Sequence, residues 1–403
     1  MKMKMKKTNR CLYVVIGVTI LLFAGMVYAW SVLSIPIAEE FPQWSKASLS
    51  LTFTLCMMFF CLGGLVGGLL AHRILPRYYV WASSLLFLTG FSVAVKTQSI
   101  ISLYIGYGLL CGFASGLAYN AVLSTVLKWF PDMKGLISGI LLMGFGMGSF
   151  LIGKAYQALT PDAVGAWRNS FLILGYVIFF VMAMGGCFVR APGKSNFTVS
   201  VADGTSNVEV NVKPLDMIKT RSFWLYFAWA VLLSAAGLVL ISQASGVARE
   251  AGPGVGAGTI ATVVGLISIF NGIGRIIFGK LLDHYGLNKT IMFNNALFIG
   301  SVLIVLAALL IKMFPVLVVG FIFCGLSYGG ITPTNSMFIN SFYGPRYYPT
   351  NFALINLNLL LASFGSTIAG SLFDASGSYL SSFIVVLLAL LLGTVCSLKI
   401  EWK

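Results

Sequence analysis

Residues 290–313 read TIMFNNALFIGSVLIVLAALLIKM, and Lys312 is the one charged side chain in this stretch. A helix of this length rises about 36 Å, which is enough to cross a hydrocarbon core of about 30 Å. Similar apolar stretches recur along the chain, at about 11–35, 49–71, 78–95, 100–127, 135–157, 167–189, 223–247, 257–282, 290–313, 315–340, 351–373 and 378–398. A membrane β-barrel would instead show segments of about ten residues with alternating polarity. The sequence therefore predicts an all-α membrane protein with twelve transmembrane helices.

The charged residues support this class and predict how the chain is oriented. They make up 9% of the 403 residues, whereas soluble domains carry about 25%. If the N-terminus is cytoplasmic, twelve crossings place 19 of the 26 Lys and Arg residues on the cytoplasmic side and six outside, with Arg275 inside a span. Cytoplasmic loops of membrane proteins carry such an excess. We therefore expect an integral multi-pass protein of the plasma (bacterial inner) membrane with both termini cytoplasmic. The net charge of +15 then reflects topology and does not indicate a nucleic-acid partner.

The chain contains an internal repeat on either side of a polar segment. We expect an N-terminal six-helix half at 1–190, a cytoplasmic linker at 191–222 and a C-terminal six-helix half at 223–403. Three short matches recur in the same order, with a spacing that grows only slowly along the chain: Gly68-x-Leu70 with Gly279-x-Leu281, Cys111-Gly112-x-x-x-Gly116 with Cys324-Gly325-x-x-x-Gly329, and Gly148-Ser149-x-x-x-Gly153 with Gly365-Ser366-x-x-x-Gly370. Two pseudo-symmetric halves that rock about a midplane site are a secondary-transporter architecture.

Arg275 is the charged residue that topology does not explain. It lies eight residues before Asp283, which we place at the cytoplasmic end of the same helix, so it is about 12 Å deep and close to the membrane centre. Placing arginine there costs about 2.5–3.5 kcal/mol even on the mildest scale, so a partner is required. The eleven Asp and Glu residues fall in predicted loops or at helix ends, so an internal salt bridge has no deep candidate. We therefore favour a substrate carboxylate over a structural ion pair as the partner.

The same depth arithmetic selects a polar and aromatic shell near Arg275, formed by Tyr119, Tyr328, Asn271, Asn356 and Asn358. Phenol and amide groups can hydrogen-bond a carboxylate, and ring faces can enclose a small apolar group. Tyrosines in membrane helices also form belts at the interface, but we favour the site for Tyr119 and Tyr328. For the three asparagines, hydrogen bonds between helices are an equally good alternative.

One loop carries a resemblance to a known superfamily. Gly279-Lys280-Leu281-Leu282-Asp283-His284-Tyr285-Gly286 resembles the motif G-x-L-x-D-x-x-G of the major facilitator superfamily, which occurs between helices 2 and 3 and again between helices 8 and 9. The first-half copy has His72 in place of the acid and Leu75 in place of the last glycine. The resemblance implies the major facilitator fold. It also implies a cytoplasmic gate made by Gly279, Asp283, Gly286, Arg73 and Arg77.

Four further passages are similar to the oxalate/formate antiporter family: Tyr28-Ala29-Trp30-Ser31, Lys128-Trp129-Phe130-Pro131-Asp132-Met133-Lys134-Gly135, Gly144-Phe145-Gly146-Met147-Gly148 and Asn271-Gly272-Ile273-Gly274-Arg275. That family resembles the wider monocarboxylate transporters, which place a carboxylate-binding arginine on helix 8. The resemblance implies a small organic anion as the substrate and Arg275 as its anchor. It also adds Tyr28 to the candidate substrate-binding residues, with a position at the membrane interface as the alternative.

The number of buried cations discriminates between substrates. A dicarboxylate such as oxalate is best matched by two cations, and oxalate-transporting relatives have a lysine on helix 11, whereas this chain has none from Asn351 to Phe373. We therefore predict a secondary active transporter of a monocarboxylate of the formate, lactate or pyruvate type, working by alternating access. An oxalate/formate exchanger remains an alternative.

The mode of coupling is less determined by the sequence. Similar monocarboxylate transporters often have an aspartate four residues before the arginine, where this chain has Asn271. We therefore prefer anion exchange or substrate-gated rocking to proton-coupled symport. A non-transporting anion receptor is a further, less favoured alternative.

Other classes of protein find little support. Gly148-x-x-x-x-Gly153-Lys154 and Gly274-x-x-x-x-Gly279-Lys280 lack the following Ser or Thr and the preceding strand of a nucleotide-binding loop. Both histidines, His72 and His284, fall at the two cytoplasmic loop motifs, and the predicted spans contain no deep acid for a catalytic pair. We expect no enzymatic activity, no cofactor and no metal site. The expected partners are the lipid bilayer and a small organic anion, with the protein a monomer.

Overall fold

The computed structural model describes residues 7–70, 74–130, 134–161, 163–190, 211–344 and 347–402, and these residues form helices and connecting turns without any strand. Eleven of the described helices are long and apolar enough to cross a membrane. One of them, α12 (Ala257–Ile311), has 55 residues and is interrupted at Gly286, whose φ of 76° and ψ of 175° are not helical. Segments of spanning length lie on both sides of this break, as the sequence predicts. The expected all-α membrane fold is confirmed.

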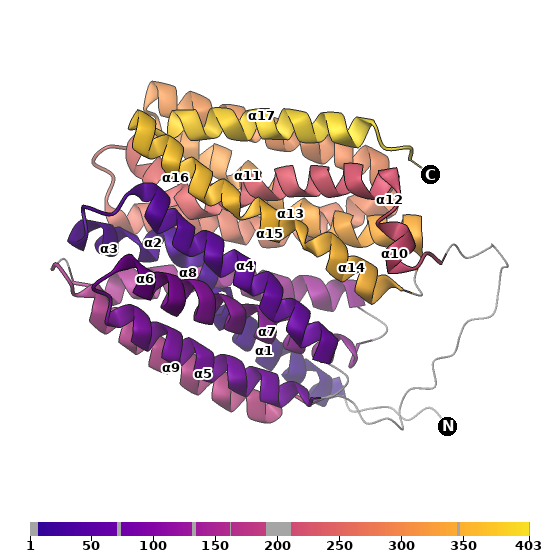
Figure 1. The fold of residues 1–403 in the computed structure, drawn as a ribbon, viewed down its shortest axis with the longest axis horizontal. Helices are drawn as coiled ribbons and strands as arrows, with labels where there is room; N and C mark the ends of the chain where they lie inside the picture. The colour runs from indigo at the N-terminus through magenta and orange to yellow at the C-terminus, as the bar shows by residue number, and fades with distance from the viewer. Residues whose placement is uncertain are drawn as a thin grey trace.

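The helices fall into two groups, one from each half of the chain. The N-half comprises α1 (Lys7–Ala24), η1 (Gly25–Ala29), α2 (Trp30–Leu33), α3 (Ile35–Glu40), α4 (Lys46–Leu70), α5 (Pro76–Val95), α6 (Ile100–Leu103), η2 (Tyr104–Cys111), α7 (Gly112–Leu127), α8 (Lys134–Leu159) and α9 (Trp167–Phe188). The C-half comprises α10 (Pro214–Met217), α11 (Arg221–Ala251), α12, α13 (Phe314–Tyr343), α14 (Tyr348–Asn356), α15 (Asn358–Ala362), α16 (Phe364–Ser376) and α17 (Tyr379–Leu398). Figure 1 shows the indigo-to-magenta N-half lying beside the salmon-to-yellow C-half.

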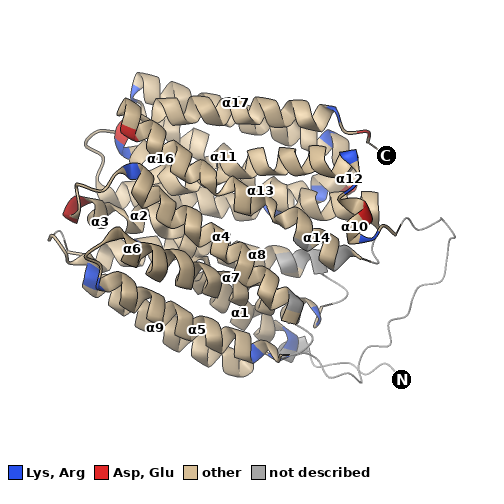
Figure 2. Ribbon diagram, in the orientation of Figure 1, with Lys and Arg blue, Asp and Glu red and all other residues tan. Residues whose placement is uncertain are grey.

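The two ends of the bundle differ in the parts of the chain that they carry. The beginning of α1 and the end of α17 lie at one end, which we call the termini face, and we call the other end the opposite face. Most Lys, Arg, Asp and Glu residues lie at these two ends, and the middle of the bundle carries few charges (Figure 2). Residues 191–210 of the expected linker lie outside the described residues, and its remainder holds α10 and the first turn of α11. Arg73 also lies outside them.

The internal repeat has a physical basis in close helix contacts. A side chain on Gly116 of α7 would overlap with the backbone carbonyl of Phe60 in α4, and one on Gly329 of α13 would overlap with that of Asn271 in α12. Gly116 and Gly329 are the matched glycines of the sequence repeat, and Phe60 and Asn271 occupy corresponding places in the two halves. Without a hydrophobic driving force inside a bilayer, such glycines allow the close backbone packing that holds helices together. Each half therefore packs its second and fourth spans in the same register.

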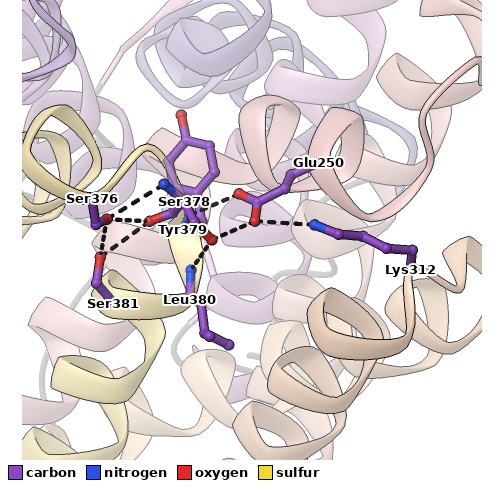
Figure 3. A network of polar contacts seen from close by, with 7 residues as sticks. All are labelled: Glu250, Lys312, Ser376, Ser378, Tyr379, Leu380 and Ser381. Carbon is purple, nitrogen blue, oxygen red and sulfur yellow. Dashed lines mark hydrogen bonds and ion pairs between the residues drawn. The ribbon is translucent and has the colours of Figure 1, made fainter.

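Each half is also held together at the opposite face by a glutamate that ends its first span. In the N-half, Glu40 accepts hydrogen bonds from Arg168 and from the indole of Trp167 at the start of α9. In the C-half, Glu250 accepts hydrogen bonds from Ser378 and from the backbone N–H of Tyr379 at the start of α17 (Figure 3). The same Glu250 carboxylate pairs with Lys312 at 3.4 Å. These contacts join the first and last spans of each half.

A second set of contacts at the opposite face joins the two halves. The carboxylate of Asp374 in the C-half accepts the backbone N–H groups of Lys46 and Ala47, where α4 begins, at 2.9 and 2.8 Å. Further along α4, Ser50 accepts a hydrogen bond from Gln243 of α11, and Thr54 donates one to the carbonyl of Ser363. All of these contacts use the first part of α4. In this structure these contacts close the opposite face.

We expect Asp374→Asn to loosen this closure, because the asparagine loses the negative charge that favours the positive end of the α4 dipole. In a background with the exposed Cys11 and Cys187 replaced by serine, Ser34→Cys at the opposite face should react about fivefold faster with a charged thiol reagent when Asp374 is changed. The measurement is the labelling rate of the full chain in nanodiscs. Asp216→Asn, at an exposed acid of the termini face, is the control, and equal rates in the two variants would contradict this prediction.

Candidate functional site

Arg275 lies inside the second half of the bundle with part of its guanidinium unsatisfied. It belongs to the interior of the span that runs from Ala257, where α12 begins, to the break at Gly286. Its Nε donates a hydrogen bond to Asn271 Oδ1, one turn earlier, at 3.2 Å. Its Nη1 nitrogen is buried and has no hydrogen-bond partner among the described residues, and no ion pair of Arg275 occurs among them. A charged guanidinium therefore keeps free donor capacity at mid-depth.

Three tyrosines from different helices lie close to this guanidinium. Tyr28, Tyr119 and Tyr328 all interact electrostatically with Arg275. Tyr119 also has a side-chain contact with Arg275, and the side chains of Tyr28 and Tyr328 contact each other. Tyr28 is 7% exposed, so it lies inside the bundle and not in an interface belt. The structure thus brings four of the predicted substrate-binding residues to Arg275, namely Asn271 and the three tyrosines. Their part in binding stays a prediction.

Aromatic rings of the N-half complete the surroundings. The ring of Phe145 lies 5.4 Å from that of Tyr28, 5.2 Å from that of Tyr119 and 5.7 Å from that of Phe60, measured between centroids. Phe60 also meets Tyr119 edge-on at 5.4 Å. We call the cluster of Tyr28, Phe60, Tyr119 and Phe145 the aromatic wall, and this wall together with Arg275, Asn271 and Tyr328 the central site. Edge-on ring pairs of this kind hold their members in fixed positions.

Sequence reasoning did not select Phe60 and Phe145. An apolar ring in a membrane helix carries no signal of function by itself, since most such rings pack against other helices or lipid. The internal repeat held a signal for Phe60, because this residue corresponds to Asn271 and packs against Gly116 as Asn271 packs against Gly329. Phe145 lies within one of the passages that carry the family resemblance.

Local distortions of the helices place Tyr28 in this cluster. The span that contains Tyr28 changes from α-helix to 3₁₀-helix over Gly25–Ala29. A side chain on Gly25 would overlap with the backbone carbonyl of Phe145, so α8 approaches the first span closely at this point. A 3₁₀ segment inside a longer helix often marks a functional hinge or local strain. The tightened turn and the close approach of α8 together bring Tyr28 and Phe145 into contact.

Asn356 and Asn358, the two predicted shell residues of the eleventh span, differ in their hydrogen bonds. Asn356 accepts a hydrogen bond from Asn335 of α13 at 3.2 Å, and Asn335 also accepts one from the hydroxyl of Tyr226 in α11. This chain of hydrogen bonds joins three helices of the C-half, and no described contact joins Asn356 to Arg275. Asn358 is 1% exposed, and neither of its amide atoms has a hydrogen-bond partner among the described residues. Neither asparagine has a described hydrogen bond to the guanidinium, and their part in binding stays a prediction.

The loop motif between the eighth and ninth spans forms the break in α12. The positive φ of Gly286 is the conformation that glycine adopts most readily, which explains this position of the motif. Asp283 is exposed, and Gly279 has open space where a side chain would lie. Arg77 lies against the rings of Tyr78 and Trp81, with its guanidinium carbon 5.0 and 5.9 Å from their centroids. A gating role for these residues stays a prediction.

Above the central site, towards the opposite face, a cavity of about 230 Å³ lies between the halves. Its lining includes Ser31, one turn from Tyr28, together with Lys46, Gln243 and Arg249. Arg249 pairs weakly with Glu39 at 3.6 Å. The described lining of this cavity includes none of the residues of the central site. No group of three or more His, Cys, Asp or Glu residues suited to a metal ion occurs in the described part of the chain.

Comparison with known proteins agrees with this arrangement. The chain is 26% identical over 349 residues to the oxalate:formate antiporter of Oxalobacter formigenes. The aligned region covers 84% of this chain and 80% of the relative. It is 25% identical over 388 residues to monocarboxylate transporter 12-B of Danio rerio, with 88% and 79% covered. Among solved structures, a bacterial homologue of the human lysosomal transporter Spinster, in an inward-facing conformation, matches with a TM-score of 0.74 at 14% identity, with 99% of this chain and all of that chain covered.

A family model matches residues 15–367, which is most of the chain. The chain belongs to the Major Facilitator Superfamily.

Proposed function

We propose that the protein is a secondary active transporter of small monocarboxylates, with Arg275 as the anchor for the carboxylate. The superfamily consists of membrane transporters, so the chain is a transporter and not an enzyme. The observation that carries the proposal is the guanidinium at mid-depth, with one buried nitrogen unpartnered and no acid paired to it among the described residues. Such a group is stable in a bilayer only with a compensating charge, and a substrate carboxylate supplies it.

The two walls of the central site suit the two ends of a small monocarboxylate. The C-half offers the cation, the Asn271 amide and the Tyr328 hydroxyl, which can hold a carboxylate. The N-half offers the aromatic wall, against which a short carbon chain can pack. The site has one cation, and the sequence from Tyr348 to Ser376 contains no Lys or Arg. A single negative charge is therefore matched, and oxalate would leave one charge uncompensated.

Alternating access follows from the division of the site between the halves. An anion bound to Arg275 of the C-half also meets the aromatic wall of the N-half, so it favours the conformations in which the halves approach each other. The contacts of Asp374, Gln243 and Ser363 with α4 close the opposite face in this structure. Rocking of two rigid halves about this site would open that face and close the termini face. We further propose a monomer in the bacterial inner membrane with both termini cytoplasmic.

Exchange of oxalate for formate is a second candidate function. Its support is the similarity to an oxalate:formate antiporter over 84% of the chain. Counterflow in proteoliposomes, with formate, lactate, pyruvate and oxalate compared on the same preparation, separates the two functions. We expect exchange of at least one monocarboxylate and little exchange of oxalate. Tight oxalate exchange without monocarboxylate uptake would contradict the proposal, and binding without counterflow would indicate a receptor.

Arg275→Lys should weaken binding of the transported monocarboxylate about tenfold, because lysine keeps the charge but loses the planar pair of donors. Arg275→Gln, which removes the charge, should weaken it by about 100-fold or more. The measurement is the half-saturation concentration of uptake in proteoliposomes. Arg249→Lys, at the exposed pair with Glu39, is the matched control. Unchanged half-saturation in both Arg275 variants would mean that Arg275 has a structural role.

Asn271→Asp should make transport sensitive to pH. An aspartate at this position lies within hydrogen-bonding distance of the Arg275 Nε, as Asn271 does now at 3.2 Å, and its carboxylate competes with the substrate for the guanidinium. We expect pyruvate uptake roughly tenfold below wild type at pH 7.5. Because the neighbouring guanidinium favours the charged form of the aspartate, uptake should recover only partly between pH 7.5 and 5.5, as protonation of the aspartate releases Arg275.

Without a pH gradient, wild type and Asn271→Leu should both show little change between these pH values, since neither has an acid beside Arg275. Equal pH profiles for Asn271→Asp and Asn271→Leu would contradict this reasoning. A wild-type protein that accumulates pyruvate in response to a pH gradient would favour the proton-coupled alternative instead.

A further inference from the structure

Tyr328 of the central site lies against a helix position that has no side chain. A Cβ atom on Gly237 of α11 would overlap with three carbons of the Tyr328 ring. The ring therefore occupies the space that any other residue at position 237 would fill. Both residues lie near the middle of their spans, Gly237 in α11 and Tyr328 in α13. Gly237 thus allows the ring to lie close to α11.

The corresponding helix contact in the N-half is made without a glycine. Ser115 corresponds to Tyr328 at the spacing that relates Cys111 to Cys324 in the sequence repeat, and its neighbour on the first span is Ala24. The Ser115 hydroxyl donates a hydrogen bond to the Ala24 carbonyl at 2.7 Å, so the two spans meet at this point as well. In the N-half, the small side chain of Ser115 leaves room for the methyl group of Ala24 on the neighbouring span. In the C-half, the large ring of Tyr328 on α13 lies against Gly237 on α11, which has no side chain.

On its other side, the Tyr328 side chain meets the central site. It interacts with Tyr28 and Arg275, and the residue is 7% exposed. A ring displaced from α11 changes its position relative to Tyr28 and the guanidinium, beside which the proposed anion would bind. Restoring ordinary contact distances requires a displacement on the order of 1 Å.

We propose that Gly237 determines the size of the carboxylate that the central site accepts, by letting the Tyr328 ring withdraw from it. This inference rests on the proposed function and adds a specificity-determining residue that does not itself touch the anion. Gly237 keeps room for carboxylates with two or more carbons behind the charged group. A methyl group at position 237 closes that room and leaves space for formate.

The test compares uptake of formate and pyruvate by the full chain in proteoliposomes. Gly237→Ala should lower pyruvate uptake relative to formate by roughly 10- to 100-fold, since pockets discriminate to this extent for small changes in volume. Gly246→Ala is the matched control. It lies on the same helix, and a Cβ atom there would overlap with the ring of Tyr379. Tyr379 lines the cavity of about 230 Å³ between the halves and does not belong to the central site. It should leave the ratio of pyruvate to formate uptake unchanged.

A second variant covers the case in which Gly237→Ala does not fold. Tyr328→Ser recreates in the C-half the small residue of the N-half pair, and it should raise pyruvate uptake relative to formate. An unchanged ratio in either folded variant would overturn the inference, as would a shift of equal size in Gly246→Ala. Wild-type protein that transports neither anion would instead overturn the proposed function, so the two failures are distinguishable.

Discussion

An arginine that must keep its charge in a low-dielectric interior is the constraint on which the central site depends. A guanidinium cannot be neutralised by losing a proton, so its environment has to supply either an acid or an anion. Asn271 satisfies only Nε, and a buried Nη1 is left without a partner among the described residues. The tyrosine hydroxyls nearby offer dipoles but no charge. In the function that we propose, the carboxylate of the substrate supplies the charge that these residues do not.

The fold was largely predictable because its signals are long and repeated. The length of the apolar stretches and the distribution of Lys and Arg depend on the bilayer alone, and the break between two predicted spans coincides with Gly286 of the loop motif. The distortions inside spans were not predictable. Neighbouring helices pass close to glycines at both distortions, the 3₁₀ segment at Gly25–Ala29 and the π-helical segment at Tyr104–Cys111. A single sequence does not show which helices are neighbours, so these segments could not be predicted from it.

Whether a site residue could be predicted depended on two properties of its side chain: its depth along the helix and the direction in which it points. Counting from a helix end gives the depth of a side chain, and this sufficed for Arg275, Tyr119 and Tyr328, whose helices are regular around them. To predict the direction in which a side chain points, the helix must be uninterrupted, because the direction follows from the regular number of residues per turn. The eleventh span is interrupted at Leu357 and again at Ser363, so the depth of Asn356 did not reveal that its amide contacts Asn335. Phe60 and Phe145 needed the packing of α4, α7 and α8, which only the structure provides.

Duplication accounts for the shared packing of the halves, and divergence accounts for the site. The glycines that pack against Phe60 and Asn271 occupy equivalent places, so the backbones of both halves follow the same course around the centre. At these matched positions the N-half has the ring of Phe60 and the C-half has the amide of Asn271. One turn further along, Gly64 of the N-half stands where the C-half has Arg275. A symmetric site would hold two cations on opposite walls and suit a dianion. Because one wall has a glycine and aromatic rings, the site offers a single charge and an apolar surface facing it.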